Sequence, residues 1–194
     1  MAARSGIVIG ALLIAAGLVA WATGFDCRLH GLLRVAPTSP LRVAALALTK
    51  LGGFAIMGPF GLAAVLILLL RKRWQAALWL FLTVGSGRLI VEGIKVLVTR
   101  PRPPRIDWLD PVASWSFPSS HSAGAMMTCV ALAMLVPGRL ALGAAIIFAV
   151  SVGWSRIALG VHWPGDVLAG WGFGLLWTGL AAHLRPAQDR PRSS

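Results

Sequence analysis

Residues 53–98 read GFAIMGPFGLAAVLILLLRKRWQAALWLFLTVGSGRLIVEGIKVLV. Two apolar runs, each near the roughly 20 residues that cross a bilayer as a helix, are separated only by Arg71, Lys72 and Arg73. A tight turn of three cations between apolar helices is typical of the cytoplasmic side of a membrane. This stretch therefore predicts a transmembrane helical hairpin, and its basic turn predicts the orientation.

The same pattern continues on both sides of the hairpin. Spans are predicted over residues 5–24, about 53–70, 74–98, about 119–136, about 140–159 and about 164–184. Polar residues 25–40 predict a loop, and residues 41–52 predict an interfacial segment before the second span. With turn 71–73 in the cytoplasm, both chain termini are expected there too. We therefore expect an all-α fold, a six-span transmembrane helical bundle.

The composition agrees with a membrane protein of one domain. Of the 194 residues, 57% are hydrophobic and 12% are charged, against about 25% charged in soluble domains. These values exclude a soluble domain and a disordered chain. Six spans use about 120 residues, so residues 1–194 are predicted to form a single integral membrane domain. The net charge of +12 is spread between apolar runs, which favours the lipid bilayer and its anionic head groups over nucleic acid as partners.

The ionisable residues of the later spans fall at helix ends on one side of the predicted bundle. These are Lys95, Arg102, His121, Arg156, His162 and Asp166. Three cations suit the charge of a phosphate without magnesium. The sequence has no carboxylate cluster or Cys/His set, so no metal is expected. A histidine followed four residues later by a carboxylate is typical of a nucleophile and its orienting group.

Three motifs carry a resemblance to a known family. They are Lys95-x6-Arg102-Pro103, Pro118-Ser119-x-His121 and Ser155-Arg156-x5-His162-x3-Asp166. Together and in this order they resemble the three-part signature of the type 2 phosphatidic acid phosphatase family, membrane lipid phosphatases related to vanadium haloperoxidases. The motif region covers about residues 86–174. One departure is Ser120, where many members have glycine.

The resemblance implies a role for each matching residue. His162 would attack phosphorus and form a phosphohistidine, Asp166 would orient it, and His121 would protonate the leaving oxygen. The phosphate would be bound by Lys95, Arg102, Arg156, Ser119 and the amide of Ser120. No metal and no other cofactor would be needed.

The resemblance also implies the reaction and its place. It implies hydrolysis of a terminal phosphate from a membrane lipid phosphate or diphosphate: undecaprenyl diphosphate, phosphatidylglycerol phosphate or phosphatidic acid. The family usually acts on the outer, periplasmic face of the bacterial inner membrane, which agrees with the predicted topology. Two alternatives stay open, a lipid phosphotransferase that passes the phosphate to another lipid, and a non-enzymatic membrane transporter. The motifs select neither the physiological lipid nor an oligomeric state.

Residues outside the motifs carry further expectations. Arg100 and Arg105 are expected to be solvated or to face lipid. Arg88 and Glu92, four residues apart in the third span, are expected to form a structural ion pair. The loop 25–40 is a candidate interfacial lid. A stripe of small residues in the last span predicts close helix packing; it consists of Gly165, Ala169, Gly170 and Gly174.

Overall fold

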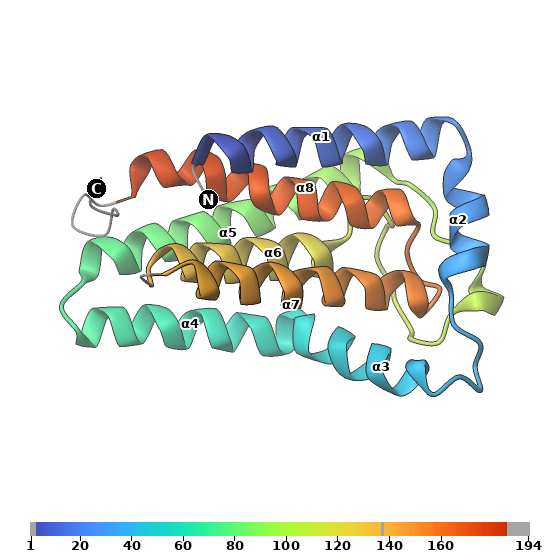
Figure 1. Cartoon of the computed structure of the whole chain (residues 1–194), viewed down its shortest axis with the longest axis horizontal. Helices are drawn as coiled ribbons and strands as arrows, with labels where there is room; N and C mark the ends of the chain where they lie inside the picture. The colour runs from blue at the N-terminus through green and yellow to red at the C-terminus, as the bar shows by residue number, and fades with distance from the viewer. Residues whose placement is uncertain (1–2, 137, 186–194) are drawn as a thin grey trace.

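The computed structural model describes residues 3–136 and 138–185, and every regular element in them is helical (Figure 1). The α-helices are α1 (Ala3–Ala22), α2 (Phe25–Leu33), α3 (Leu41–Gly52), α4 (Phe54–Leu70), α5 (Trp74–Val98), α6 (Ser120–Met134), α7 (Arg139–Ala158) and α8 (Pro164–Ala181). Two 3-10 helices, η1 (Arg105–Asp107) and η2 (Ala182–Leu184), lie between α5 and α6 and directly after α8. The predicted all-α fold is confirmed.

Several of these helices can cross a membrane. Four are long and apolar enough: α1, α5, α7, and α8 continued by η2. A fifth candidate is α3 with α4, which bend by 44° where they meet. The described residues therefore contain four to five candidate spans, and the chain is a helical membrane protein. Because α6 has 15 residues, fewer than the roughly 20 that cross a bilayer, the six-span count stays a prediction.

The segment predicted as a polar loop contains a helix, α2. Asp26 and His30, four residues apart, are both buried on it. A spacing of four brings two side chains to the same face of a helix, and α2 turns this face toward α7 and α8. The loop prediction is wrong for these residues because their polar side chains are buried in the protein instead of facing solvent.

Helix α1 packs along α8, which is the most extensive helix pair of the described chain. Two glycine pairs bring the two backbones into contact. A Cβ added at Gly172 would lie 2.6 Å from the carbonyl oxygen of Gly10. A Cβ added at Gly17 would lie 2.5 Å from the carbonyl oxygen of Gly165. Close approach of this kind is what small residues permit in membrane helices. The predicted close packing of the last span is confirmed at Gly165.

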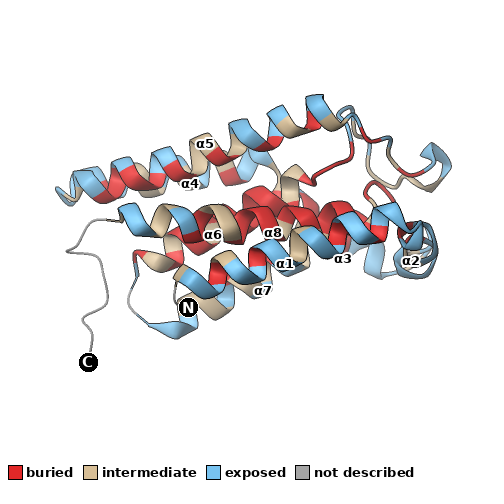
Figure 2. Ribbon diagram, turned by 90° about the horizontal axis from the view of Figure 1, so that it is seen from above, coloured by how far each residue is buried: buried red, intermediate tan, exposed pale blue. Residues whose placement is uncertain are grey.

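Helix α6 lies in the centre of the bundle, with most of its residues buried between α5, α7 and α8 (Figure 2). Its first half contains a run of four small residues, Ser122, Ala123, Gly124 and Ala125. These allow three helices to approach it at once. The start of α6, the end of α5, the end of α7 and the start of α8 lie toward one end of the bundle, near α2 (Figure 1).

Candidate active site

His162 and Asp166 lie together where the α7–α8 connection enters α8. Nδ1 of His162 is 3.3 Å from Oδ2 of Asp166, and both residues are buried. Pro164 occupies the start of α8, and Asp166 Oδ2 accepts the backbone N–H of Trp163 at 3.0 Å, closing the first turn. This cap holds the carboxylate in place. With a proton on Nδ1, the ring keeps a lone pair on Nε2.

Arg102 lies on the other side of the His162 ring. Its Nη1 is 3.0 Å from Nε2 of His162 and donates to the carbonyl oxygen of Val161 at 2.6 Å. Its Nε donates to the carbonyl of Ser114 at 2.6 Å. The imidazole therefore lies between a carboxylate and a guanidinium. A phosphate held by this guanidinium would lie next to Nε2.

Two further cations converge on the same region from other helices. Nζ of Lys95, in the last turn of α5, donates to the carbonyl of Trp115 at 2.6 Å, and Arg102 donates to that carbonyl at 3.2 Å. Nη1 of Arg156, near the end of α7, donates to Thr49 Oγ1 and to Asp110 Oδ2, the latter at 2.7 Å. The connection between α5 and α6 thus supplies acceptors to all three predicted phosphate-binding cations.

Burial and these cations set the charge of the histidine. Burial first, and then nearby positive charges, of which Arg102 is the largest, hold the pKa of His162 well below its usual value. The ring is therefore neutral at pH 7, as a nucleophile requires. Burial and the charge of Arg156 lower the pKa of Arg102 to about 10, so this guanidinium stays charged at pH 7.

The start of α6 contributes the remaining predicted site residues. Ser119 is the N-cap: its Oγ accepts from the backbone N–H of Ser122 at 3.4 Å and from the hydroxyl of Ser122 at 3.0 Å. The backbone N–H of Ser119 donates to the carbonyl of Asp166 at 3.0 Å, which ties α6 to α8. Oγ of Ser120 donates to Glu92 Oε1 at 2.6 Å. Its backbone N–H belongs to the first turn, where helices offer free donors to anions.

His121 lies on the first turn of α6 and lines a cavity of about 590 Å³ between α4, α5 and α6. A Cβ added at Gly53 would lie 3.4 Å from its Nε2. The ring therefore faces the junction of α3 and α4, and the glycine there leaves room for it.

Arg100 is not solvated and does not face lipid, so that prediction is wrong. It is 4% exposed and lies 4.5 Å above the ring of Trp21. Its Nη1 donates to Asp166 Oδ1 and its Nη2 to Asp26 Oδ2, each at 2.6 Å. The other oxygen of Asp26 accepts the backbone N–H of Gly165 at 2.7 Å. A buried cation between two buried carboxylates keeps all three charges paired.

The expected Arg88–Glu92 ion pair is also wrong. None of the salt bridges among the described residues joins the two side chains. Glu92 instead accepts the Ser120 hydroxyl, and the guanidinium of Arg88 lies 5.0 Å above the ring of Phe54. Their helical spacing allows the pair. In the structure, however, Glu92 contacts Ser120 of α6 and Arg88 contacts Phe54 of α4.

Three functional side chains outside the motifs emerge only from the tertiary structure. Ser116 donates its hydroxyl to Asp166 Oδ2, Thr49 accepts from Arg156, and Asp110 pairs with Arg156. Thr49 lies in α3, and Asp110 and Ser116 lie in the α5–α6 connection. Hydroxyl and carboxyl side chains are common in helices and loops, so nothing in the sequence distinguishes these three as site residues. The described residues contain no group of three His, Cys, Asp or Glu side chains that could hold a metal, and the metal-free reaction stays a prediction.

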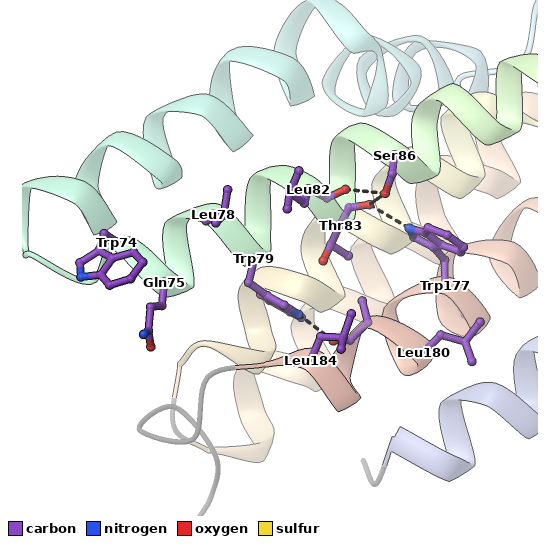
Figure 3. A pocket seen from close by; sticks show the side chains of 11 residues that line it. Trp74, Gln75, Leu78, Trp79, Leu82, Thr83, Ser86, Trp177, Leu180 and Leu184 are labelled. Atoms are coloured by element: carbon purple, nitrogen blue, oxygen red, sulfur yellow. Dashed lines mark hydrogen bonds between the residues drawn. The ribbon is translucent and has the colours of Figure 1, made fainter.

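A second cavity, of about 630 Å³, lies at the opposite end of α5 and α8 (Figure 3). Two of its three tryptophans donate within the protein: Trp79 Nε1 to the carbonyl of Ala181 at 2.7 Å, and Trp177 Nε1 to the carbonyl of Thr83 at 3.0 Å. The lining residues that the structure describes include no ionisable side chain. Among the described lining residues, the hydroxyls of Thr83 and Ser86 are therefore not accompanied by a carboxyl, imidazole or amino group that could act as acid or base.

The residues of the motif region match one protein family. The match is to the PAP2 superfamily and covers residues 76–190. The chain belongs to the PAP2 superfamily. Within the superfamily, it is 37% identical over 117 residues to phosphatidylglycerophosphatase B of Bacillus subtilis, covering 55% of this chain and 56% of that protein. It thus spans a little over half the length of that relative.

Two further comparisons extend over more of the chain. The undecaprenyl-diphosphatase of Sulfolobus acidocaldarius is 28% identical over 156 residues, which cover 76% of this chain and 72% of that protein. The crystal structure of a transmembrane PAP2 type phosphatidylglycerolphosphate phosphatase from Bacillus subtilis aligns with a TM-score of 0.79 and 27% identity, covering 99% of this chain and 98% of that chain. The helical arrangement of this PAP2 chain therefore matches a solved membrane protein over nearly its whole length.

Proposed function

We propose that the chain is a lipid phosphate phosphatase that works through a phosphohistidine. The observation that carries the proposal is the imidazole of His162, held between Asp166 on one nitrogen and Arg102 on the other. Membership of the PAP2 superfamily supports the same reaction class. The substrate is a membrane lipid with a terminal phosphate: undecaprenyl diphosphate, phosphatidylglycerol phosphate or phosphatidic acid.

The reaction proceeds in two displacements. Nε2 of His162 attacks the terminal phosphorus, the P–N bond forms, and the bond from phosphorus to the leaving oxygen breaks. His121, in its protonated form, gives that oxygen a proton. It then takes a proton from the water that attacks the phosphohistidine, so phosphate is released and both histidines are restored.

The cations act on the charge of the transferring group. Lys95, Arg102 and Arg156 stabilise the three equatorial oxygens, with the hydroxyl of Ser119 and the amide of Ser120 as further donors. Asp166 stabilises the imidazolium that develops as His162 attacks. Because three cations supply this stabilisation, we propose that no metal ion takes part.

We propose six spans, with α6 as the short one, both termini in the cytoplasm, and the site on the periplasmic face of a bacterial inner membrane. In support of this, the basic turn after α4, the start of α1 and the end of α8 lie toward one end of the bundle (Figure 1). The start of α8, two residues after His162, lies toward the other end. Cations of short loops collect on the cytoplasmic side.

The first experiment measures phosphate release by the detergent-purified chain. Polyprenyl diphosphate, phosphatidylglycerol phosphate and phosphatidic acid are supplied separately, each with excess EDTA. We expect release that survives EDTA and falls by at least about 1000-fold in His162→Ala, whereas Arg42→Met, at an exposed position of α3, keeps wild-type activity.

Other outcomes point to the alternatives. Release that EDTA abolishes would refute the metal-free reaction. A folded protein that releases no phosphate but labels an added lipid alcohol with phosphate would be a phosphotransferase. Absence of both reactions, or reactions that persist in His162→Ala, would refute the proposed chemistry.

A further inference from the structure

The cavity at His121 extends from the proposed active site along α5. It has a volume of about 590 Å³. Its wall is apolar at Phe54 and Leu89 and polar at Arg88, Glu92, Ser120 and His121. In the proposed reaction, His121 protonates the leaving oxygen, so the rest of the leaving group extends from that oxygen into this cavity.

Arg88 places a cation deep in this cavity wall. It precedes Lys95 by seven residues in α5, which is about 10 Å along a helix. Its Nη2 is buried and makes no hydrogen bond to a residue that the structure describes. None of the salt bridges among those residues includes Arg88. A charged side chain in a membrane span normally has an ionic partner.

The protein itself compensates this charge only in part. Glu92 is the nearest acidic residue of the same helix, but its Oε1 accepts the hydroxyl of Ser120. The ring of Phe54, 5.0 Å from the guanidinium carbon, gives a cation–π contact, which offsets only a fraction of the desolvation of a cation. Gly124 of α6 leaves the space for the guanidinium, because a Cβ there would lie 2.5 Å from Nη2.

We propose that Arg88 and this cavity form a subsite for an anionic leaving group. The proposal rests on the phosphatase function above and specifies its substrate: the enzyme prefers lipids in which a second phosphate remains on the leaving group. When the terminal P–O bond breaks, the departing lipid takes the proton of His121 and keeps this phosphate, which Arg88 binds.

Two kinds of lipid have this chemistry. In a lipid diphosphate the second phosphate is directly attached to the leaving oxygen, and in phosphatidylglycerol phosphate it is the diester beyond the glycerol. Phosphatidic acid has none, because its leaving group is neutral diacylglycerol. The subsite therefore separates the first two from the third through charge.

The test compares wild type, Arg88→Met, Arg88→Lys and the control Arg42→Met on all three lipids. We expect Arg88→Met to lower kcat/KM about 10- to 100-fold for the two lipids with a second phosphate. For phosphatidic acid, kcat/KM should change less than about threefold. Arg88→Lys should keep most of the preference for lipids with a second phosphate because it keeps the positive charge. Arg42→Met removes a positive charge elsewhere and should leave kcat/KM unchanged for all three lipids.

The pattern of loss decides the source of the phosphate. Loss on the diphosphate alone, or on phosphatidylglycerol phosphate alone, supports the subsite and names its ligand. Equal loss on all three lipids, or no loss on any, overturns the proposal.

A binding measurement keeps the subsite separate from the reaction. Dioctanoyl phosphatidylglycerol has the diester but no terminal phosphate, and dioctanoylglycerol is its neutral counterpart. We expect dioctanoyl phosphatidylglycerol to raise the Tm of wild type and of Arg88→Lys more than that of Arg88→Met, by linkage of binding to unfolding. Dioctanoylglycerol should show no such difference. If wild type hydrolyses no lipid but its Tm shift exceeds that of Arg88→Met, the phosphatase proposal fails and the anion subsite stands. Equal Tm shifts in wild type and Arg88→Met overturn the subsite.

Discussion

At the scale of single residues, the carboxylate of Asp166 connects the proposed nucleophile to the rest of the protein. One oxygen accepts from Arg100, and the other faces His162 and accepts from Ser116 and from the backbone of Trp163. Each of these partners fixes the carboxylate from a different direction. The orientation of the imidazole therefore depends on residues that never touch the phosphate.

Arg100 is the partner whose loss we expect to destabilise the protein most. In Arg100→Ala the buried carboxylates of Asp26 and Asp166 lose their shared cation, so we expect the free energy of unfolding to fall by about 3–5 kcal/mol. Thermal and denaturant unfolding in detergent measure this loss. Arg105→Ala is the matched control, because Arg105 is exposed and its loss should cost less than about 0.5 kcal/mol. Equal destabilisation by the two changes would contradict the role given to Arg100.

The lowered pKa of His162 predicts the acid side of the pH profile. Neutral imidazole attacks, so protonation of His162 should not lower kcat/KM as the pH falls through 6.5, the usual pKa of histidine, and should lower it only well below that pH. Arg102 is the cation that contributes most to this lowering. In Arg102→Met the histidine should protonate more easily, and the decline should move to higher pH, on top of lower activity. An acid limb at the same pH in both proteins would show that another group titrates there.

Residue spacing predicts some of this site and not the rest. His162 and Asp166 are four residues apart at the start of a helix, so local geometry alone brings them together. Arg100 and Asp26 are separated by 74 positions, and the buried environment that pairs them exists only after α1, α2 and α8 have packed. The sequence predicts that Arg100, in a proline-rich connection, is solvated, because no neighbouring residue indicates which distant helices bury it.

At the scale of elements, glycine contacts decide how closely α1 and α8 approach. In Gly172→Ala the new Cβ would lie 2.6 Å from the carbonyl oxygen of Gly10. Backbone atoms cannot rotate away, so the helices must separate, and we expect a loss of about 1–3 kcal/mol in unfolding free energy. Gly143→Ala, in α7, has nothing within 4 Å of the new Cβ and should leave stability unchanged or raise it. The two variants are compared by thermal unfolding in the same detergent, and similar Tm values would rule out a tight contact.

Element boundaries follow from hydropathy where a helix is apolar throughout, as in α4. They do not follow where burial is by protein instead of lipid. The 15-residue α6 is enclosed by other helices, so its ends depend on its neighbours and not on bilayer thickness. Helix α2 is short and partly polar, and it forms because Asp26 and His30 are buried against other helices.

At the scale of the whole molecule, the proposed orientation can be tested by labelling. In a chain with Cys27 and Cys129 replaced by serine, single cysteines are introduced at Ala113, exposed in the α5–α6 connection, or at Leu184, 82% exposed at the end of η2. A membrane-impermeant maleimide should label Ala113→Cys in intact cells and Leu184→Cys only after permeabilisation. The reverse pattern would place the site in the cytoplasm and overturn the topology.

The α1–α8 pair also has a consequence for how the protein is made. Helix α1 finds its main partner in α8, which the ribosome produces only after α2 to α7. Until residues 164–181 have been translated, the glycine face of α1 has only lipid or other proteins to contact. Chains that stop early would therefore lack the closing contact of the bundle together with His162 and Asp166. Closure of the fold around α1 and assembly of the site thus both wait for the synthesis of α8.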